Sequence, residues 1–291
     1  MTNYPAAFTS AADNGAVRCE LCPRKCMIFL EQIGFCGARE NRGGSLFVRN
    51  YGQVSSVALD PIEKKPLHMF MRGSQILSVG GFGCNLRCPY CQNYAISIEY
   101  ETSIRHGAGD RYMLPEEVAQ HAAQAAEIGN IGVAYTYNEP LISYEFVKDC
   151  AVAVRNEKLK NVLVTNGFIN TEPLLSLLPL IDAMNIDLKA FSEDFYSQIG
   201  GKLETVKSTI ASAIKHCHVE VTTVVIPGEN ENDIEALAAW LASLSRDIPL
   251  HLSRFFPRYK YVDKAPAEVK HLYRLRDLAK RHLKHVFLGN V

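Results

Sequence analysis

The residues with the clearest chemical potential in this chain are its nine cysteines, which are grouped rather than scattered. Three of them, Cys84, Cys88 and Cys91, follow one another in the pattern C-x3-C-x2-C. A structural zinc ion takes four ligands in a closed tetrahedron, and an iron–sulfur cluster without an open position takes four cysteines. The spacing therefore favours a cubane cluster with one open iron. The alternative is a zinc ion that borrows a distant fourth ligand.

Four further cysteines lie within 18 residues near the start of the sequence: Cys19, Cys22, Cys26 and Cys36. Four thiolates can close a tetrahedral zinc site, which would stabilise a segment that is short of hydrophobic core. They could equally hold an auxiliary iron–sulfur cluster. Pro23 and Gly37 beside these cysteines suit the turns of a zinc knuckle and favour a structural metal. The two single cysteines, Cys150 and Cys217, are expected to be ordinary packed residues.

The elements that must position the three-cysteine loop follow a regular alternation. Apolar runs of strand length occur at 76–79, 132–137, 161–165, 183–188, 219–226, 249–255 and 286–288. Helical patterns separate them, near 114–126, 141–156, 172–178, 203–216, 231–245 and 266–283. Such alternation predicts parallel strands joined by right-handed crossovers.

The number of these units favours an incomplete barrel. Six or seven units follow residue 75, fewer than the eight of a complete barrel, which typically needs about 250 residues. We therefore predict an α/β fold with two parts, a cysteine-rich metal-binding segment at 1–74 and a partial (βα)6-type TIM barrel at 75–291. A doubly wound open sheet is the alternative. In either architecture the active-site groups gather at the carboxyl ends of the strands.

Polar motifs occur at those strand ends, one after another. The three-cysteine loop follows the first strand, and Tyr137-Asn138-Glu139 closes the second. Thr165-Asn166-Gly167 follows the third strand, and Asp187-Leu188-Lys189 follows the fourth. Each triplet alone is a weak signal, since it could be a turn or the start of a helix. Their order along the chain favours one shared site.

The three-cysteine loop, with Tyr90 directly before its last cysteine, resembles that of the radical S-adenosylmethionine (SAM) enzymes. The resemblance implies a [4Fe-4S] cluster on Cys84, Cys88 and Cys91, whose open iron binds the amino and carboxylate groups of SAM. One electron would cleave SAM to methionine and a 5′-deoxyadenosyl radical, which abstracts hydrogen from a substrate.

The same resemblance implies roles for the strand-end residues. Tyr90 would lie beside the adenine of SAM, and Glu139, preceded by Asn138, would pair with the ammonium of its methionine part. Four more residues are implied near the ribose and the carboxylate of SAM: Thr165, Asn166, Asp187 and Lys189.

Further motifs narrow the resemblance. The N-terminal cysteine pattern, the segment DPIEKKPL at 60–67, the YTYNEP motif, the segment HLSRFFPRYK at 251–260 and the terminal LGNV resemble those of the AmmeMemoRadiSam-system radical SAM proteins. Those proteins are related to the activating enzymes of pyruvate formate-lyase. A charged run such as DPIEKK is usually a solvated loop, but this resemblance implies that Glu63, Lys64 or Lys65 contacts substrate or a partner. His251 alone is more often a packed histidine than a pocket residue.

We predict a radical SAM enzyme of oxidoreductase or transferase type that acts on an unidentified substrate, which could be a protein. The first alternative is an activase of a glycyl radical enzyme. Such activases usually carry Asp where this chain has Val164, and Gly-Gly-Glu where it has Tyr137-Asn138-Glu139. The second alternative is a non-catalytic metal-binding scaffold.

Composition limits the other classes of function. Lys and Arg number 31 and are balanced by 31 Asp and Glu, which argues against a protein that coats nucleic acid or an anionic membrane. No apolar run approaches the roughly 18 residues that span a bilayer, and the first residues show no secretory signal. We therefore expect a cytoplasmic protein whose partners are SAM and a flavodoxin- or ferredoxin-type electron donor.

Overall fold

The computed structural model of the chain describes residues 4–105 and 111–291. Its largest sheet has eight strands in the order β14-β13-β12-β11-β10-β9-β8-β7. Strands β8 to β14 are parallel: Gln75–Gly80, Asn130–Tyr135, Lys160–Thr165, Ala183–Asp187, His218–Val225, Leu250–Arg254 and Val286–Gly289. Each strand lies beside the next one in the sequence, so the crossovers never reverse direction as a doubly wound sheet requires. The predicted α/β partial barrel is confirmed.

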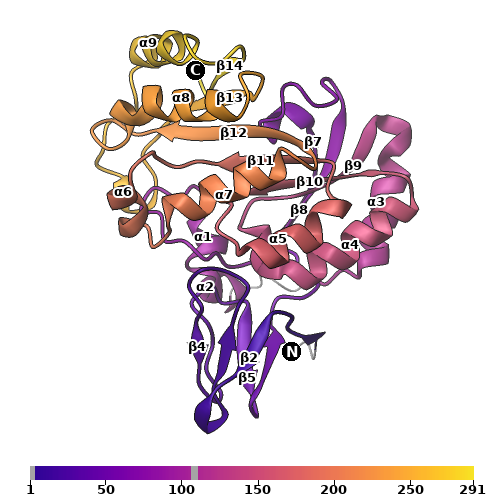
Figure 1. Ribbon diagram of the computed structural model, residues 1–291. Coiled ribbons are helices and arrows are strands. Elements are labelled where there is room, and N and C mark those ends of the chain that lie inside the picture. Colours follow the sequence, from indigo (N-terminus) through magenta and orange to yellow (C-terminus); the bar gives the residue numbers. More distant parts are fainter. Residues whose placement is uncertain (1–3, 106–110) are drawn as a thin grey trace.

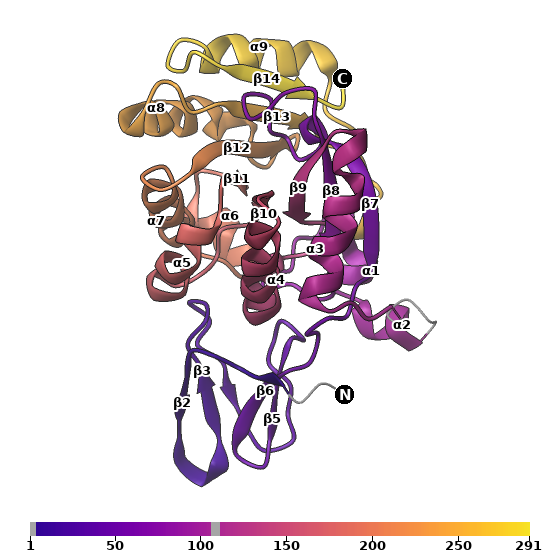
Figure 2. The ribbon, with the colours of Figure 1, turned by 90° about the vertical axis from the view of Figure 1, so that its right-hand side faces the viewer.

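Helices cover the outer side of this sheet (Figures 1 and 2). The helices that connect the strands are α3 (Pro115–Gln124), α4 (Tyr144–Asn156), α5 (Thr171–Leu177), α7 (Leu203–Ala213), α8 (Ile234–Leu244) and α9 (Val269–Ala279). Each has an apolar face of the predicted kind; in α3, Val118, Ala119 and Ala122 are buried. Three short helices were not predicted, because they lie within loops: α1 (Tyr94–Ser97), α2 (Tyr100–Arg105) and α6 (Glu193–Gln198).

The N-terminal residues form two small antiparallel sheets that project from the barrel (Figure 1). One contains β1 (Tyr4–Pro5), β6 (Ser45–Val48) and β5 (Arg39–Arg42), and the other β2 (Thr9–Ala11), β3 (Val17–Cys19) and β4 (Met27–Ile28). Val17, Ile28, Leu46 and Val48 of these strands are buried and belong to the main hydrophobic core. A buried ion pair joins them to the barrel, since Arg39 Nη1 lies 2.8 Å from a carboxylate oxygen of Glu145 on α4.

Strand β7 (Ser56–Pro61) links the two parts of the chain. It pairs antiparallel with β8, from Ser56 opposite Gly80 to Pro61 opposite Gln75. The sequence analysis identified this run as strand-like but grouped it with residues 1–74. In the structure it is an edge strand of the barrel sheet, because its backbone N–H and C=O groups pair with those of β8. The division after residue 74 stays a prediction of domain organisation, and a few residues of both parts (1–3 and 106–110) lie outside the described range.

The segment after β7 closes the amino-terminal end of the barrel. The 3₁₀ turn η2 (Ile62–Lys64) reverses the chain, and Ile62 and Leu67 are buried among apolar side chains from the first halves of β8 to β11. Glu220 on β12, which is fully buried, accepts hydrogen bonds from the backbone N–H groups of His68 and Met69 at 3.0 and 2.7 Å.

The histidines of this floor have structural roles. His218 and His251 place their Nε2 atoms 2.9 and 2.6 Å from the oxygens of Glu220. His251 is therefore a packed, hydrogen-bonded residue, in agreement with the more common role of such a histidine. Within residues 4–105 and 111–291, no helix combines the length and the apolar character that crossing a bilayer requires.

Candidate active site

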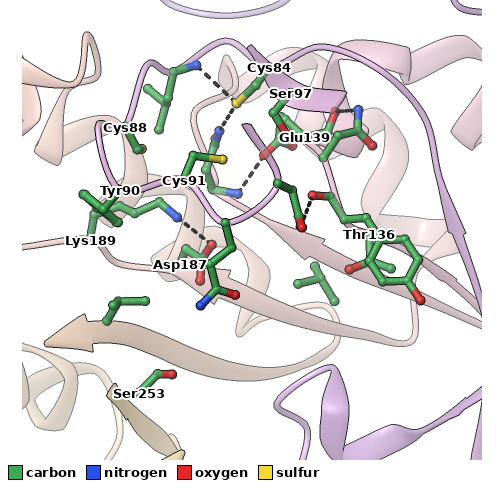
Figure 3. A pocket seen from close by; sticks show the side chains of 18 of the residues that line it. Cys84, Cys88, Tyr90, Cys91, Ser97, Thr136, Glu139, Asp187, Lys189 and Ser253 are labelled. Atoms are coloured by element: carbon green, nitrogen blue, oxygen red, sulfur yellow. Dashed lines mark hydrogen bonds and ion pairs between the residues drawn. The ribbon is translucent and has the colours of Figure 1, made fainter. Parts of the chain in front are cut away.

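A cavity of about 330 Å³ lies at the carboxyl ends of the barrel strands (Figure 3). It is lined by all ten residues that the sequence analysis assigned to the cluster or to SAM: Cys84, Cys88, Tyr90, Cys91, Asn138, Glu139, Thr165, Asn166, Asp187 and Lys189. They come from the loop after β8 and from the ends of β9, β10 and β11. The volume is in the range of small-molecule sites.

The three thiols lie on a loop that is packed tightly from both sides. Gly83 has φ +88°, and a Cβ atom there would lie 2.3 Å from the carbonyl oxygen of Cys36, so only glycine fits. Cys84 Sγ accepts hydrogen bonds from the backbone N–H of Leu86 at 3.4 Å and from the Asn166 amide at 3.6 Å. Burial raises the pKa of the Cys88 thiol to about 11, although the ammonium of Lys189 acts against it. A bound metal would remove these protons.

Asn138 holds the start of this loop against the end of β9. Its Oδ1 accepts the backbone N–H of Gly81 at 2.9 Å, and its Nδ2 donates to the carbonyl of Gly83 at 3.1 Å. Both ends of the side-chain amide are therefore used by the protein. Asn138 lines the cavity, and the bonds it makes are those of a residue that positions the cysteine loop, whereas its predicted role in binding SAM stays a prediction.

Glu139 is a buried carboxylate that accepts hydrogen bonds from residues at the end of β10. It is 2% exposed, and it accepts hydrogen bonds from the hydroxyl of Thr165 at 2.7 Å and the backbone N–H groups of Leu141 and Asn166 at 2.9 and 2.8 Å. Burial raises the pKa of Glu139 to about 7, against these hydrogen bonds and the charge of Lys189, which lower it. A carboxylate has about four acceptor positions, so one remains for a ligand.

Asp187 and Lys189 form an ion pair at the end of β11, with 2.7 Å between Nζ and Oδ2 (Figure 3). Burial lowers the pKa of Lys189, but the carboxylate of Asp187 and the Cys88 sulfur raise it more, so it lies above its usual value. The Lys189 backbone is fixed as well, because its N–H donates to the Tyr196 hydroxyl and its carbonyl accepts from Asn230.

Tyr90 provides an aromatic wall of the cavity. Its ring is 6% exposed, with centroids 6.3 Å from Phe195 and 6.1 Å from Tyr261. A flat apolar surface of this kind suits a nucleobase.

The sequence analysis missed the lining residues of the last two strands: Ser253, Phe255, Phe256 and Asn290. Asn290, directly after β14, donates from Nδ2 to the Ser253 hydroxyl at 3.0 Å. Two signals were available: their position at strand ends, and the resemblance of the segments HLSRFFPRYK and LGNV to a known family, which assigned no role to these four residues. Of the DPIEKK segment, Lys64 and Lys65 line the cavity, whereas the Glu63 carboxylate accepts the backbone N–H of Gly73.

The N-terminal cysteines share a second, smaller cavity, lined by Cys19, Cys22, Cys26 and Cys36 with Arg24, Arg39 and Asn85. The backbone N–H of Cys19 donates to the Cys26 carbonyl at 3.0 Å and brings these two residues together. Arg39 is 1% exposed, and its Nε and Nη2 atoms are buried without a hydrogen-bond partner. Burial raises the pKa of Cys19 to about 11 and that of Cys22 to about 12.

The two groups of thiols are joined by short contacts. Arg24 donates from Nε to the carbonyl of Asn85, the residue after Cys84, at 2.8 Å. The ring of Phe35 lies between two guanidinium groups, 3.5 Å from that of Arg24 and 3.9 Å from that of Arg87. In the described part of the chain, no three Cys, His, Asp or Glu side chains already converge on the position of a single metal ion.

Comparison with known proteins agrees with this geometry. The family model of the radical SAM superfamily matches residues 78–241, and the chain belongs to that superfamily. The uncharacterized protein MJ0808 of Methanocaldococcus jannaschii is 41% identical over 292 residues, which are 98% of this chain and 85% of that protein. Pyruvate formate-lyase 1-activating enzyme of Escherichia coli strain K12 is 29% identical over 161 residues, 53% of this chain and 62% of the enzyme.

Solved structures share the fold. The crystal structure of Streptococcus suis SuiB bound to S-adenosylmethionine superimposes with a TM-score of 0.55 at 13% identity, covering 71% of this chain and 47% of that one. At this identity the likeness shows the fold alone. Members of the superfamily are enzymes, and membership implies a [4Fe-4S] cluster and SAM. The predicted radical SAM resemblance is thus confirmed, and the narrower resemblance to the AmmeMemoRadiSam system stays a prediction.

Proposed function

We propose that this protein cleaves SAM reductively and abstracts a hydrogen atom from a substrate. The observation that carries the proposal is the single cavity shared by three thiols, a buried carboxylate with a spare acceptor position, and a lysine–aspartate pair. When bound, the cluster supplies the electron that splits SAM into methionine and a 5′-deoxyadenosyl radical.

The donor set of the loop fits an iron–sulfur cluster. Cys84, Cys88 and Cys91 offer three soft sulfur ligands, which suit iron in such clusters, and leave one position for SAM. Leu86 and Asn166 donate hydrogen bonds to Cys84 Sγ, which would stabilise a thiolate.

The other lining residues fit the parts of SAM. The free acceptor position of Glu139 suits the methionine ammonium, which would return the pKa of this carboxyl toward its ordinary range. The Lys189 ammonium suits the carboxylate of SAM, and Asp187, Thr165 and Asn166 offer groups for the ribose. Tyr90 offers its ring to the adenine.

The test is reductant-dependent formation of 5′-deoxyadenosine by the anaerobically reconstituted protein. We expect product with the wild type and none with Cys84→Ala, Cys88→Ala or Cys91→Ala, each checked by circular dichroism for an intact fold. Cys217→Ala is the matched control, because Cys217 is a half-buried cysteine outside both cavities. Failure of the wild type to cleave SAM would overturn the proposal in favour of a non-catalytic scaffold.

An activase of a glycyl radical enzyme is the second candidate, favoured by the similarity to the activating enzyme of E. coli. Tyr137 lines the cavity where the activases carry glycine, and Val164 replaces their aspartate. An anaerobic mixture of the reconstituted protein, a one-electron reductant, SAM and pyruvate formate-lyase provides the test. A glycyl radical signal by EPR would support the activase, and we expect none.

We also propose that the N-terminal cysteines hold a closed four-thiolate metal centre with a structural role. Four thiolates around one metal centre carry net negative charge, which would give the two unpartnered nitrogens of buried Arg39 acceptors. Burial keeps free thiols protonated here, so a metal is needed to generate that charge. Both zinc and a [4Fe-4S] cluster satisfy the donor set.

Iron, sulfide and zinc analysis of the anaerobically purified protein identifies this metal. We expect Cys22→Ala to lose one centre while the loop centre stays. Equal metal content in wild type and Cys22→Ala would contradict the proposal of a metal centre on the N-terminal cysteines. A flavodoxin- or ferredoxin-type protein is the proposed electron donor, and the cytoplasm, whose reducing conditions suit nine free thiols, is the proposed compartment.

A further inference from the structure

The residues proposed to hold the cluster and SAM account for only part of the cavity. Its other lining residues include Lys64, Lys65, Tyr137, Ser253, Phe256 and Asn290. Ser253 lies on the opposite side of the cavity from Cys84 in Figure 3. These residues form a wall that is available to a substrate, and we call it the lysine wall.

The two lysines are held in this wall by the floor of the barrel. Asn185 on β11 donates from Nδ2 to the carbonyl of Pro66 at 2.8 Å, and Glu220 accepts the N–H groups of His68 and Met69. Leu67 is fully buried. The chain on the carboxyl side of Lys65 is therefore fixed inside the barrel, which accounts for a lysine side chain that is only 3% exposed.

The charges of the lysine wall do not balance. Asp60 is the shared partner, with Oδ1 3.2 Å from Lys64 Nζ, and Oδ2 2.8 Å from Lys65 Nζ. The Tyr137 hydroxyl donates to the same carboxylate at 2.7 Å. Burial alone would raise the pKa of Asp60, but these three donors lower it well below its usual range, so the carboxylate stays charged. Burial lowers the pKa of Lys65, but the charged Asp60 carboxylate beside it acts in the opposite direction and favours the ammonium form. Two ammonium groups then face one carboxylate, with an excess of one positive charge.

Neither of the two carboxylates among the described lining residues lies within ion-pair distance of Lys64 or Lys65. The lining carboxylates are Glu139, which is bonded to Thr165, Leu141 and Asn166, and Asp187, which is paired with Lys189. The Lys64 side chain is 66% exposed, and its one ion pair among the described residues is the 3.2 Å approach to Asp60. An ammonium has three donors, so Lys64 can bind an oxyanion in the cavity.

Tyr137 contacts both Asp60 and Lys65 and adopts an unfavourable backbone conformation. Its φ is +72°, in the left-handed region that non-glycine residues rarely adopt. Its ring lies 4.7 Å from Lys65 Nζ and packs on Gly80, where a Cβ atom would lie 2.8 Å from the ring. Strain retained at a cavity is typical of functional positions. Here it places the hydroxyl on Asp60 and the ring beside Lys65.

We propose that the lysine wall binds an anionic group of the substrate, a carboxylate or a phosphate, with Lys64 as the contacting residue and Asp60 and Tyr137 as positioning residues for Lys65. That this anionic group belongs to a substrate rests on the proposed function. The substrate of this cavity then carries a negative charge, which excludes cationic and purely apolar compounds.

The test uses two probes on the anaerobically purified, cluster-containing protein, inorganic phosphate observed by ³¹P NMR and succinate observed by ¹H NMR. We expect one probe to bind the wild type, which identifies the oxyanion, and Lys64→Gln to weaken its binding by about tenfold, as for a lost charge-assisted hydrogen bond. Lys64→Arg keeps the charge and is expected to retain the binding. Lys270→Gln on the exposed face of α9 is the matched control.

Three outcomes overturn the proposal: no binding of either probe to the wild type, equal binding by Lys64→Gln and wild type, or the same loss with Lys270→Gln. The response of the cluster EPR signal to SAM is recorded separately in the wild type. An absent response contradicts SAM binding but leaves the anion titration valid, so failure of the proposed function and failure of the lysine wall are distinguished.

Discussion

The two groups of thiols in this protein lie next to each other but are built in different ways. The N-terminal group has four cysteines, Cys19 at the end of β3 and the other three in the connections between strands of two to four residues, beside the buried guanidinium of Arg39. The loop group has three cysteines, and the ends of three barrel strands surround it with polar side chains. Four sulfur ligands close a metal centre, whereas three leave a position open. The number of cysteines is therefore what distinguishes the structural role proposed for the N-terminal group from the reactive role proposed for the loop group.

The largest expected effect separates the two groups directly. Cys88→Ala should reduce 5′-deoxyadenosine formation to background, because the open cluster loses a ligand. Cys22→Ala should keep the SAM-dependent change of the loop cluster's EPR signal and lower the temperature of unfolding. Loss of that change in Cys22→Ala would show that the N-terminal centre takes part in SAM binding, and the comparison would fail.

The second prediction breaks the contact between the two regions. Glu145→Gln removes the buried partner of Arg39 and should lower the free energy of unfolding in urea by about 3 to 5 kcal/mol, the usual cost of leaving a buried charge unpaired. The control is Glu204→Gln in the exposed Lys207–Glu204 pair, which should cost about 0.3 kcal/mol. Equal effects of the two substitutions would mean that the buried pair does not join the regions.

The third prediction concerns Glu220, a buried carboxylate on β12 of the barrel. Burial favours protonated Glu220, but hydrogen bonds from His218, His251 and two backbone N–H groups outweigh burial and lower its pKa to about 2. Because the pKa is lower in the folded state, this stabilisation is present above about pH 4.5 and is lost as the pH falls toward 2, a total of about 3 kcal/mol.

Urea unfolding of wild type and Glu220→Gln at pH 7, 5 and 3 tests this expectation. The difference in the free energy of unfolding should be largest at pH 7 and shrink toward pH 3. A difference that does not change with pH would show that Glu220 acts through packing alone.

The smallest expected effect tests whether Glu139 contributes to SAM binding beside the three-cysteine loop. Glu139→Gln removes the charge that we propose to pair with the methionine ammonium and should weaken SAM binding by about tenfold, the scale of one charge-assisted hydrogen bond. A SAM titration followed by the cluster EPR signal measures it. Glu172→Gln, at an exposed position in the first turn of α5, should leave the affinity unchanged.

Much of the site could be predicted from the sequence, because its residues lie at the ends of strands with regular spacing. Glu139, Thr165, Asn166, Asp187 and Lys189 follow three consecutive strands, and parallel strands bring their carboxyl ends to one edge. Ser253 and Asn290 follow strands too, but their residue types suggested no chemistry. The engaged amide of Asn138 also could not be foreseen, since its partners are backbone groups of another loop.

The sequence by itself determined the local features: the two cysteine groups, the alternation of seven strands with six helices, and the order of the polar motifs. These features are encoded within a few residues of one another, through side-chain periodicity and thiol spacing. Only the tertiary structure decided that β7 joins the barrel sheet, that Arg39 pairs with Glu145, and that Lys64 enters the cavity. Those contacts join residues far apart in the chain, and their energies depend on burial, which the completed fold creates.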